Sequence, residues 1–200
     1  AVVAIAMDRE RCAATVLAES ALPASMAHLN TDASGRWLFS ASYGAHLVAV
    51  QPLLAGGLVG TASVHSTGPN AHCTQVHPSN QWVLAASLGG GQLHRYRFDA
   101  NTGTLTPTEQ PTVPMPQGTG PRHLRFNRTG DRVYLLGELD AQVHVLSFDA
   151  ASGDMALLQT LPTLPARFAG TAWGADLHLS PDGRWLYTSE RNSHTLAGFA

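Results

Sequence analysis

The sequence predicts an all-β protein: a β-propeller built from four-stranded blades. Two repeats and the lack of any sustained helical period support this fold class. The first repeat is a polar strand, a turn and an apolar strand, with turn residues Gly35, Asn80, Gly130 and Gly183. Successive turns lie 45, 50 and 53 residues apart. A repeat of about 40–50 residues that holds four short strands is typical of a propeller blade.

A second repeat agrees with the first. The segment Phe98–Gly103 recurs as Phe148–Gly153, again 50 residues further along. Between the turns, segments such as Gln142–Phe148 alternate polar and apolar residues, as half-buried strands do. Both repeats therefore indicate the same modular β architecture.

The phase of the repeat predicts the blade boundaries within one domain, residues 1–200. Residues 1–20 read as the two outer strands of a blade, and residues 164–200 as the inner strands of another, ending within its third strand. Three complete blades are expected between them, at residues 21–66, 67–117 and 118–163. Because natural proteins rarely leave sheet edges open, we expect a part of a longer propeller. The alternative is a closed ring of four blades, in which residues 1–20 complete the last sheet.

Composition excludes several classes of function. The formal net charge is -2, which gives no support to a nucleic-acid or anionic-membrane partner. All 12 basic residues are arginine, so this chain offers neither a Schiff-base lysine nor a P-loop lysine. Cys12 and Cys73 are too few for a disulfide framework. The apolar stretch Ala1–Met7 lacks preceding basic residues, so it resembles a buried strand more than a signal peptide.

Ionisable residues recur at fixed distances from the repeated turns. In antiparallel blades, the start of the innermost strand and the end of the second strand lie at the same rim of the central channel. Seven or eight residues before the turns, and eight after them, the sequence places His28, His72, Arg122, His123, Asp176, Glu138 and Arg191. We therefore expect these side chains to converge at one mouth of the channel.

The chemistry of this set suits an anionic substrate and a proton transfer. Arginine forks bind carboxylate or phosphate, and Glu138 and the histidines can act as general acids or bases. Structural alternatives stay open for four residues: Arg122 and Glu138 could simply join two strands, His28 could be structural, and His123 could orient a neighbour.

No metal or cofactor is expected. The ten histidines include no H-x-x-x-H or H-E-x-x-H spacing. His28, His72 and His123 could ring a metal ion, but the positive charge of Arg122 beside them would repel it.

Two further features are expected to be mainly structural. Trp37, Trp82 and Trp185 recur at the start of the second strand of a blade, which indicates packing between blades. The stretch 161–173 is longer than the matching connections. It is either a plain insertion or a loop that covers a ligand through Arg167 or Trp173.

Four motifs carry a resemblance that covers all 200 residues. Gly118–His123, Gly137–Leu139, Ala175–Gly183 and Ser189–Arg191 resemble the lactonase family of seven-bladed propellers, which includes bacterial 6-phosphogluconolactonases and fungal carboxymuconate-cyclising enzymes. Ala18–Pro23 and Ala71–His72 are similar to the bacterial branch in particular. The resemblance implies seven blades, of which about four lie in this chain.

The resemblance also implies residue roles. The catalytic residues would be His72, Arg122, Glu138 and Arg191. The resemblance does not extend to His28, His123, Asp176 and His178, which we expect to bind the substrate at the same channel mouth. Glu138 and His72 both remain candidates for the base. This chain departs from the family where Gly137 replaces the usual Asn and Glu190 the commoner Asp, which puts the exact substrate in doubt.

The implied activity is hydrolysis of 6-phospho-glucono-1,5-lactone in the pentose phosphate pathway, without a metal and in the cytoplasm. The partner would be a small anionic sugar lactone, with no nucleic acid or membrane involved. Two alternatives remain: a cyclase or decyclase that acts on a muconate-type acid, and a non-enzymatic propeller that binds proteins.

Overall fold

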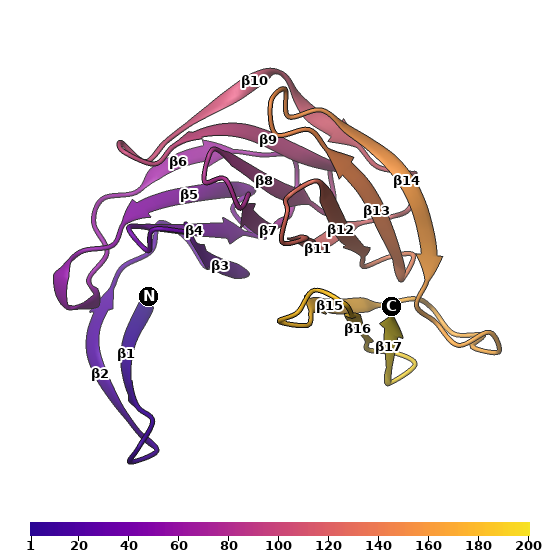
Figure 1. Cartoon of the computed structure of the whole chain (residues 1–200), viewed down its shortest axis with the longest axis horizontal. Coiled ribbons are helices and arrows are strands. Elements are labelled where there is room, and N and C mark those ends of the chain that lie inside the picture. Colours follow the sequence, from indigo (N-terminus) through magenta and orange to yellow (C-terminus); the bar gives the residue numbers. More distant parts are fainter.

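The computed structural model describes residues 1–200, and its regular secondary structure consists almost entirely of antiparallel strands. Five sheets lie side by side along an open arc, with the N-terminal hairpin and the last sheet at its two ends (Figure 1). The prediction of an all-β partial propeller is confirmed.

Three of the sheets have four strands each and are numbered here as blades 1 to 3. Blade 1 contains β3 (His28–Thr31), β4 (Trp37–Ser42), β5 (Leu47–Pro52) and β6 (Ser63–Ser66). Blade 2 contains β7 (Ala71–Val76), β8 (Trp82–Ser87), β9 (Gln92–Asp99) and β10 (Thr104–Pro114). Blade 3 contains β11 (Pro121–Phe126), β12 (Arg132–Gly137), β13 (Gln142–Phe148) and β14 (Met155–Pro162).

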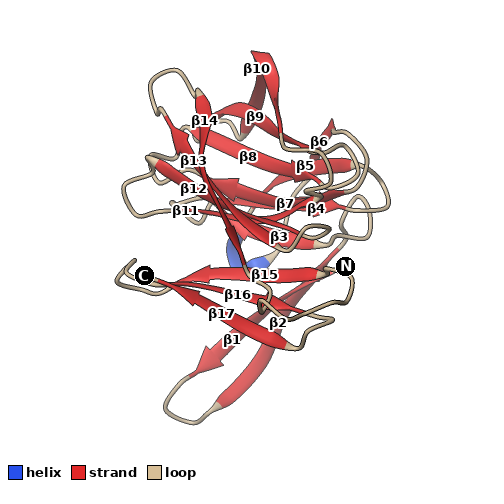
Figure 2. Cartoon of the chain, turned by 90° about the vertical axis from the view of Figure 1, so that its right-hand side faces the viewer, coloured by secondary structure: helices blue, strands red, loops and turns tan.

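The remaining elements flank these blades. Blade 4 has three strands, β15 (Gly174–Leu179), β16 (Leu186–Glu190) and β17 (Thr195–Phe199). The N-terminal hairpin pairs β1 (Val2–Asp8) with β2 (Ala13–Ser20). The short 3-10 turn η1 (Ala55–Gly57) is the one helical element in Figure 2. The chain has no helix whose length and hydropathy would let it cross a bilayer.

Each blade is a meander in which consecutive strands pair. The first strand of each blade is innermost, and β7 contacts β3 on one side and β11 on the other, while β11 also contacts β15. The functional candidates lie on these first strands or at the ends of the second ones. The fold therefore carries them onto one inner rim.

Apolar side chains fill the spaces between the blades. One core cluster joins blades 1 and 2 and includes Phe39 and Val83, and another joins blades 2 and 3 and includes Leu84 and Leu124. All six residues of β8 are buried, because both faces of this strand are covered by neighbouring blades. Such burial explains the continuous apolar character of the second strands.

The repeated turn residues have a common backbone conformation. Gly35, Asn80, Gly130 and Gly183 have φ values of 68°, 60°, 82° and 72°. Positive φ strains most L-residues, and Gly and Asn adopt it most readily. The backbone requirement explains why only these two residue types occupy the repeated position.

The two sequence repeats contact each other between neighbouring blades: a tryptophan next to the first repeat's turn packs on the second repeat's segment in the next blade. Trp37 donates from Nε1 to the Ala100 carbonyl of blade 2 at 2.9 Å. Trp82 makes the equivalent bond to the Ala150 carbonyl of blade 3 at 2.8 Å. A Cβ at Gly103 or Gly153 would overlap these indole rings, so glycine is required at the end of the recurring turn. Packing between blades, predicted for the tryptophans, is thus observed for Trp37 and Trp82.

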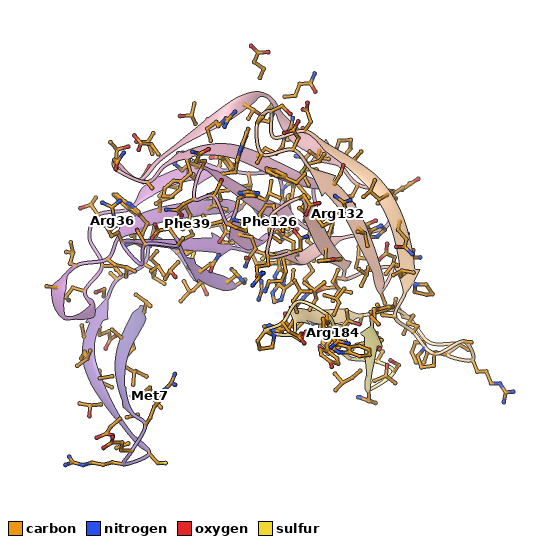
Figure 3. All side chains as sticks on the ribbon, viewed as in Figure 1. Met7, Arg36, Phe39, Phe126, Arg132 and Arg184 are labelled. Atoms are coloured by element: carbon orange, nitrogen blue, oxygen red, sulfur yellow. The ribbon has the colours of Figure 1, made fainter.

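The structure contradicts one expectation about the N-terminal segment and one alternative. β1 is a strand but is not buried, with Ile5 52% and Met7 67% exposed, because the hairpin contacts the rest of the chain mainly through η1. Met7 lies on this isolated hairpin in Figure 3. The hairpin also forms its own sheet rather than pairing with β17, so the closed ring of four blades is not formed.

Candidate active site

All eight predicted site residues lie on the inner rim of the arc. His28 begins β3, His72 lies in β7, and Asp176 and His178 lie in β15. Arg122 and His123 lie in β11, while Glu138 and Arg191 directly follow β12 and β16. Nitrogen-rich side chains gather on the inner side of the arc (Figure 3).

Local irregularities in the innermost strands aim these side chains. The pairing register shifts between Ala71 and Cys73 in β7 and between Pro121 and His123 in β11. A third shift lies between Gly174 and Leu177 in β15. A β-bulge turns its extra residue out of the regular alternation. The shift at Arg122 explains how two consecutive residues, Arg122 and His123, both belong to the same polar cluster.

Two arginines from neighbouring blades share one carboxylate. Arg122 Nε lies 2.8 Å from Glu138 Oε2, and Arg191 Nη2 lies 2.7 Å from the same oxygen. The side chains of Arg122 and Glu138 are 15% and 14% exposed. Burial and the nearby Arg191 lower the pKa of Arg122 from its ordinary value, while Glu138 opposes them. Two guanidinium groups on one carboxylate leave one positive charge in excess, which suits an anionic ligand.

Three imidazole rings pack beside this arginine pair. The His123 ring centroid lies 5.4 Å from that of His28 and 5.2 Å from that of His72. Burial, with the charges of His123 and Arg125, lowers the pKa of His28 to about 3. Burial, with the charges of Arg122 and His123, lowers the pKa of His72 to about 4. These two rings are therefore neutral at pH 7.

His123 connects the imidazoles to the carboxylate of Asp176. Its Nδ1 lies 2.5 Å from Asp176 Oδ1, and its Nε2 lies 3.5 Å from Arg122 Nη1. His178 Nε2 contacts the other oxygen of Asp176 at 3.0 Å. All eight predicted residues thus form one connected set, although their roles toward a substrate remain a proposal. No group of histidine, cysteine or acidic residues in the structure has the geometry of a metal site.

The long connection 163–173 reaches this set through Trp173. The Arg191 guanidinium lies 3.9 Å from the centroid of the Trp173 ring, and Arg191 Nε donates to the Trp173 carbonyl at 3.2 Å. Glu190 is 4% exposed and accepts a hydrogen bond from the Trp173 backbone N–H at 2.5 Å. Glu190 is thus an anchor for the loop, while Arg167 lies exposed on it.

The motif position at Gly137 is built for glycine. A Cβ there would overlap the Asp140 carboxylate and lie 2.6 Å from the Thr119 carbonyl oxygen. An asparagine at this position would therefore require the surrounding turn to move. The local packing of this chain therefore explains why glycine, and not the usual asparagine, stands at position 137.

Sequence reasoning missed Arg125. This residue follows His123 by two positions in β11, so regular alternation places it on the same face. Its charge contributes to lowering the pKa of both His28 and His123. The period of two along β11 was the signal that could have identified it.

A surface hollow of about 490 Å³ lined by Asn80 and Asp99 lies outside this polar set.

The neutral histidines predict a pH-dependent stability. The ordinary pKa of 6.5 falls to about 3 in His28 and about 4 in His72. Below pH 6.5 the unfolded chain therefore binds more protons than the folded chain, and stability falls as pH drops toward 4. Each such group contributes at most about 1.4 kcal/mol per pH unit.

Urea unfolding between pH 7 and 4.5 measures this effect. We expect His28→Gln to flatten the decline, whereas His65→Gln, on the outer strand β6, serves as the matched change and is expected to flatten it less. Equal slopes in the wild type and His28→Gln would contradict the prediction.

The comparisons with known proteins agree with this architecture. The family model described as "Lactonase, 7-bladed beta-propeller" matches residues 1–200. A 6-phosphogluconolactonase of Pectobacterium carotovorum is 40% identical over 181 residues, covering 90% of this chain and 54% of that protein. One of Serratia proteamaculans is 38% identical over 180 residues, covering 90% and 54%.

A solved structure shows the same arrangement of blades. The Pseudomonas aeruginosa periplasmic gluconolactonase superposes with a TM-score of 0.87 at 30% identity, covering 99% of this chain and 59% of that one. The chain thus spans little more than half the length of these relatives. Both the motifs and the folded blades place it in one group: the chain belongs to the lactonase family of seven-bladed β-propellers.

Proposed function

We propose that the protein hydrolyses 6-phospho-glucono-1,5-lactone to 6-phosphogluconate. The observation that carries the proposal is the convergence of Arg122 and Arg191, from two blades, on Glu138 beside a cluster of neutral imidazoles. Relatives named 6-phosphogluconolactonase, 36–40% identical to this chain, support the choice of substrate.

The arginines fit the charge that this reaction develops. Attack of water on the lactone carbonyl produces an oxyanion, and the substrate also carries a phosphate. Guanidinium groups that are already positioned stabilise such charge without reorganising. Arg122 and Arg191 are held by Glu138, and Arg191 is further fixed by the Gly174 carbonyl at 2.7 Å. We assign the binding of the oxyanion or the phosphate to these two side chains.

Arg122→Ala tests the proposal in the full-length protein. We expect kcat/KM for 6-phosphogluconolactone to fall by about 100-fold, the loss typical of one oxyanion donor. Rates are measured above the spontaneous reaction and with EDTA present, because the proposed mechanism needs no metal. Arg132→Ala is the matched control, since that side chain is 41% exposed and pairs with Asp131.

The outcomes separate the related activities. A wild type that hydrolyses glucono-1,5-lactone equally well would make the phosphate unimportant, as the name of the Pseudomonas neighbour suggests for that protein. Turnover of muconate-type lactones alone would favour a cyclase or decyclase. No excess over the spontaneous rate with any lactone would overturn the proposal and favour a binding platform.

A cytoplasmic location belongs to the same proposal. A phosphorylated sugar lactone is charged and does not cross a bilayer unaided, so its hydrolase is expected where the sugar phosphate is made. Fractionation of cells that express the full-length protein checks this, and recovery in the periplasm would contradict it.

A further inference from the structure

The proposed reaction needs a base to activate water, and the site offers Glu138, His72 and His123. We propose that His123 is this base and that Asp176 is its positioning residue, the two forming an Asp–His dyad across blades 3 and 4. The inference rests on the proposed function and assigns a step within it.

The neighbours of His123 define its tautomer. Asp176 Oδ1, an acceptor, lies 2.5 Å from Nδ1, so Nδ1 carries the proton. Arg122 Nη1, which can only donate, faces Nε2 at 3.5 Å. Nε2 therefore presents its lone pair toward the arginine that would bind the oxyanion. A base and an electrostatic catalyst side by side can act on one water and one carbonyl.

The carboxylate of Asp176 is itself held in place. Its Oδ1 accepts the Leu177 backbone N–H at 2.7 Å, and its Oδ2 contacts His178 at 3.0 Å. Burial opposes ionisation, but the hydrogen bonds from His123 and Leu177 outweigh it and lower the pKa of Asp176 to about 2. A fixed negative charge at Nδ1 stabilises the imidazolium that forms when Nε2 takes a proton.

The other two candidates lack these features. His72 Nδ1 is buried without a hydrogen-bond partner, so no acceptor fixes the tautomer of this ring. Glu138 Oε2 already accepts two charged hydrogen bonds, at 2.8 and 2.7 Å, whereas the one donor that faces His123 Nε2 lies 3.5 Å away. Glu138 Oε2 is therefore the poorer proton acceptor. His72 instead packs against His123 as part of the wall of the site, and Glu138 holds the two arginines.

The proton and electron transfers balance without any co-reactant. Water oxygen forms a bond to the lactone carbonyl carbon as His123 Nε2 takes a water proton, and the carbonyl π electrons move to the oxygen. The tetrahedral intermediate then collapses, and the bond from that carbon to the ring oxygen breaks. The ring oxygen takes the proton from Nε2 and becomes a hydroxyl, while the new carboxyl group loses its proton to solvent.

The surroundings of His123 predict how the pH dependence of kcat/KM changes when Asp176 is replaced. Burial lowers its pKa, Asp176 raises it through a hydrogen bond, and Arg122 and Arg125 lower it. His28 and His72 face the ring from blades 1 and 2, and His178 faces Asp176. Asp176→Asn removes the raising contribution, so the acidic limb of kcat/KM should move to lower pH while the plateau falls.

The test compares His123→Gln and Asp176→Asn in the full-length protein. We expect kcat to fall by about 100-fold or more in His123→Gln and by about 10-fold or more in Asp176→Asn, with KM changed less than kcat. His65→Gln on β6 and Asp131→Asn in an exposed turn are matched controls that should retain wild-type kcat. Thermal melting verifies that each variant is folded.

A second measurement does not depend on turnover. Nitrogen-15 NMR of the imidazoles should show His123 protonated at Nδ1 and unprotonated at Nε2 in the wild type, with this tautomer lost in Asp176→Asn. A His123 protonated at Nε2, or a folded His123→Gln that keeps kcat while Arg122→Ala is inactive, overturns the dyad and leaves the lactonase proposal intact. A wild type inactive on every lactone overturns both.

Discussion

Trp82→Ala is expected to lower the free energy of unfolding by about 3–5 kcal/mol, the range for removing a buried aromatic ring. The indole is fully buried in the core between blades 2 and 3. It packs against Phe148 with ring centroids 5.7 Å apart, and the Arg97 guanidinium lies 3.7 Å from its ring centroid. The substitution also leaves the Ala150 carbonyl without its indole donor.

Urea unfolding followed by circular dichroism measures this loss, and Trp173→Ala is the matched control. The Trp173 ring is 44% exposed and lies on a loop, so its removal should cost less than about 1 kcal/mol. Trp82→Phe should lie between the two, because it keeps most of the apolar area but loses the hydrogen bond. Equal losses in Trp82→Ala and Trp173→Ala would contradict the interblade role.

The fold could be predicted because its signals are local. The turns at Gly35, Asn80, Gly130 and Gly183 need positive φ, and that need limits the residue type at each one. Trp82 and Ala150 are 68 residues apart in the sequence, so the sequence alone did not reveal that the two repeats contact each other. The exposure of Met7 was missed because an apolar segment does not reveal what covers it.

The candidate site could be located because each blade repeats the same distance from turn to rim. Counting from the turns placed His28 and Asp176 in the set that the structure brings together. The bulges in β7, β11 and β15 carry no clear sequence signal, since they arise from pairing with the next strand. The pairing of His123 with Asp176 across two blades therefore needed the structure.

Glu138→Gln is expected to lower kcat/KM for 6-phosphogluconolactone by about 1000-fold, more than the loss of either arginine alone. The reason is that Glu138 Oε2 holds both guanidinium groups, at 2.8 and 2.7 Å. Glutamine has one neutral acceptor and an amide donor that faces other donors, so the arginines are expected to separate. Two oxyanion-stabilising groups would then be displaced together.

The pH profile distinguishes this anchoring role from a role as base. If Glu138 only holds the arginines, the residual activity of Glu138→Gln keeps an acidic limb governed by His123. If Glu138 took the water proton, that limb would disappear with the carboxylate. Asp131→Asn removes an equivalent charge from an exposed pair with Arg132 and should leave both rate and profile unchanged. Unaltered turnover in Glu138→Gln would show that the shared carboxylate has no part in catalysis. Arg191 would then have to be held by the carbonyls of Gly174 and Trp173.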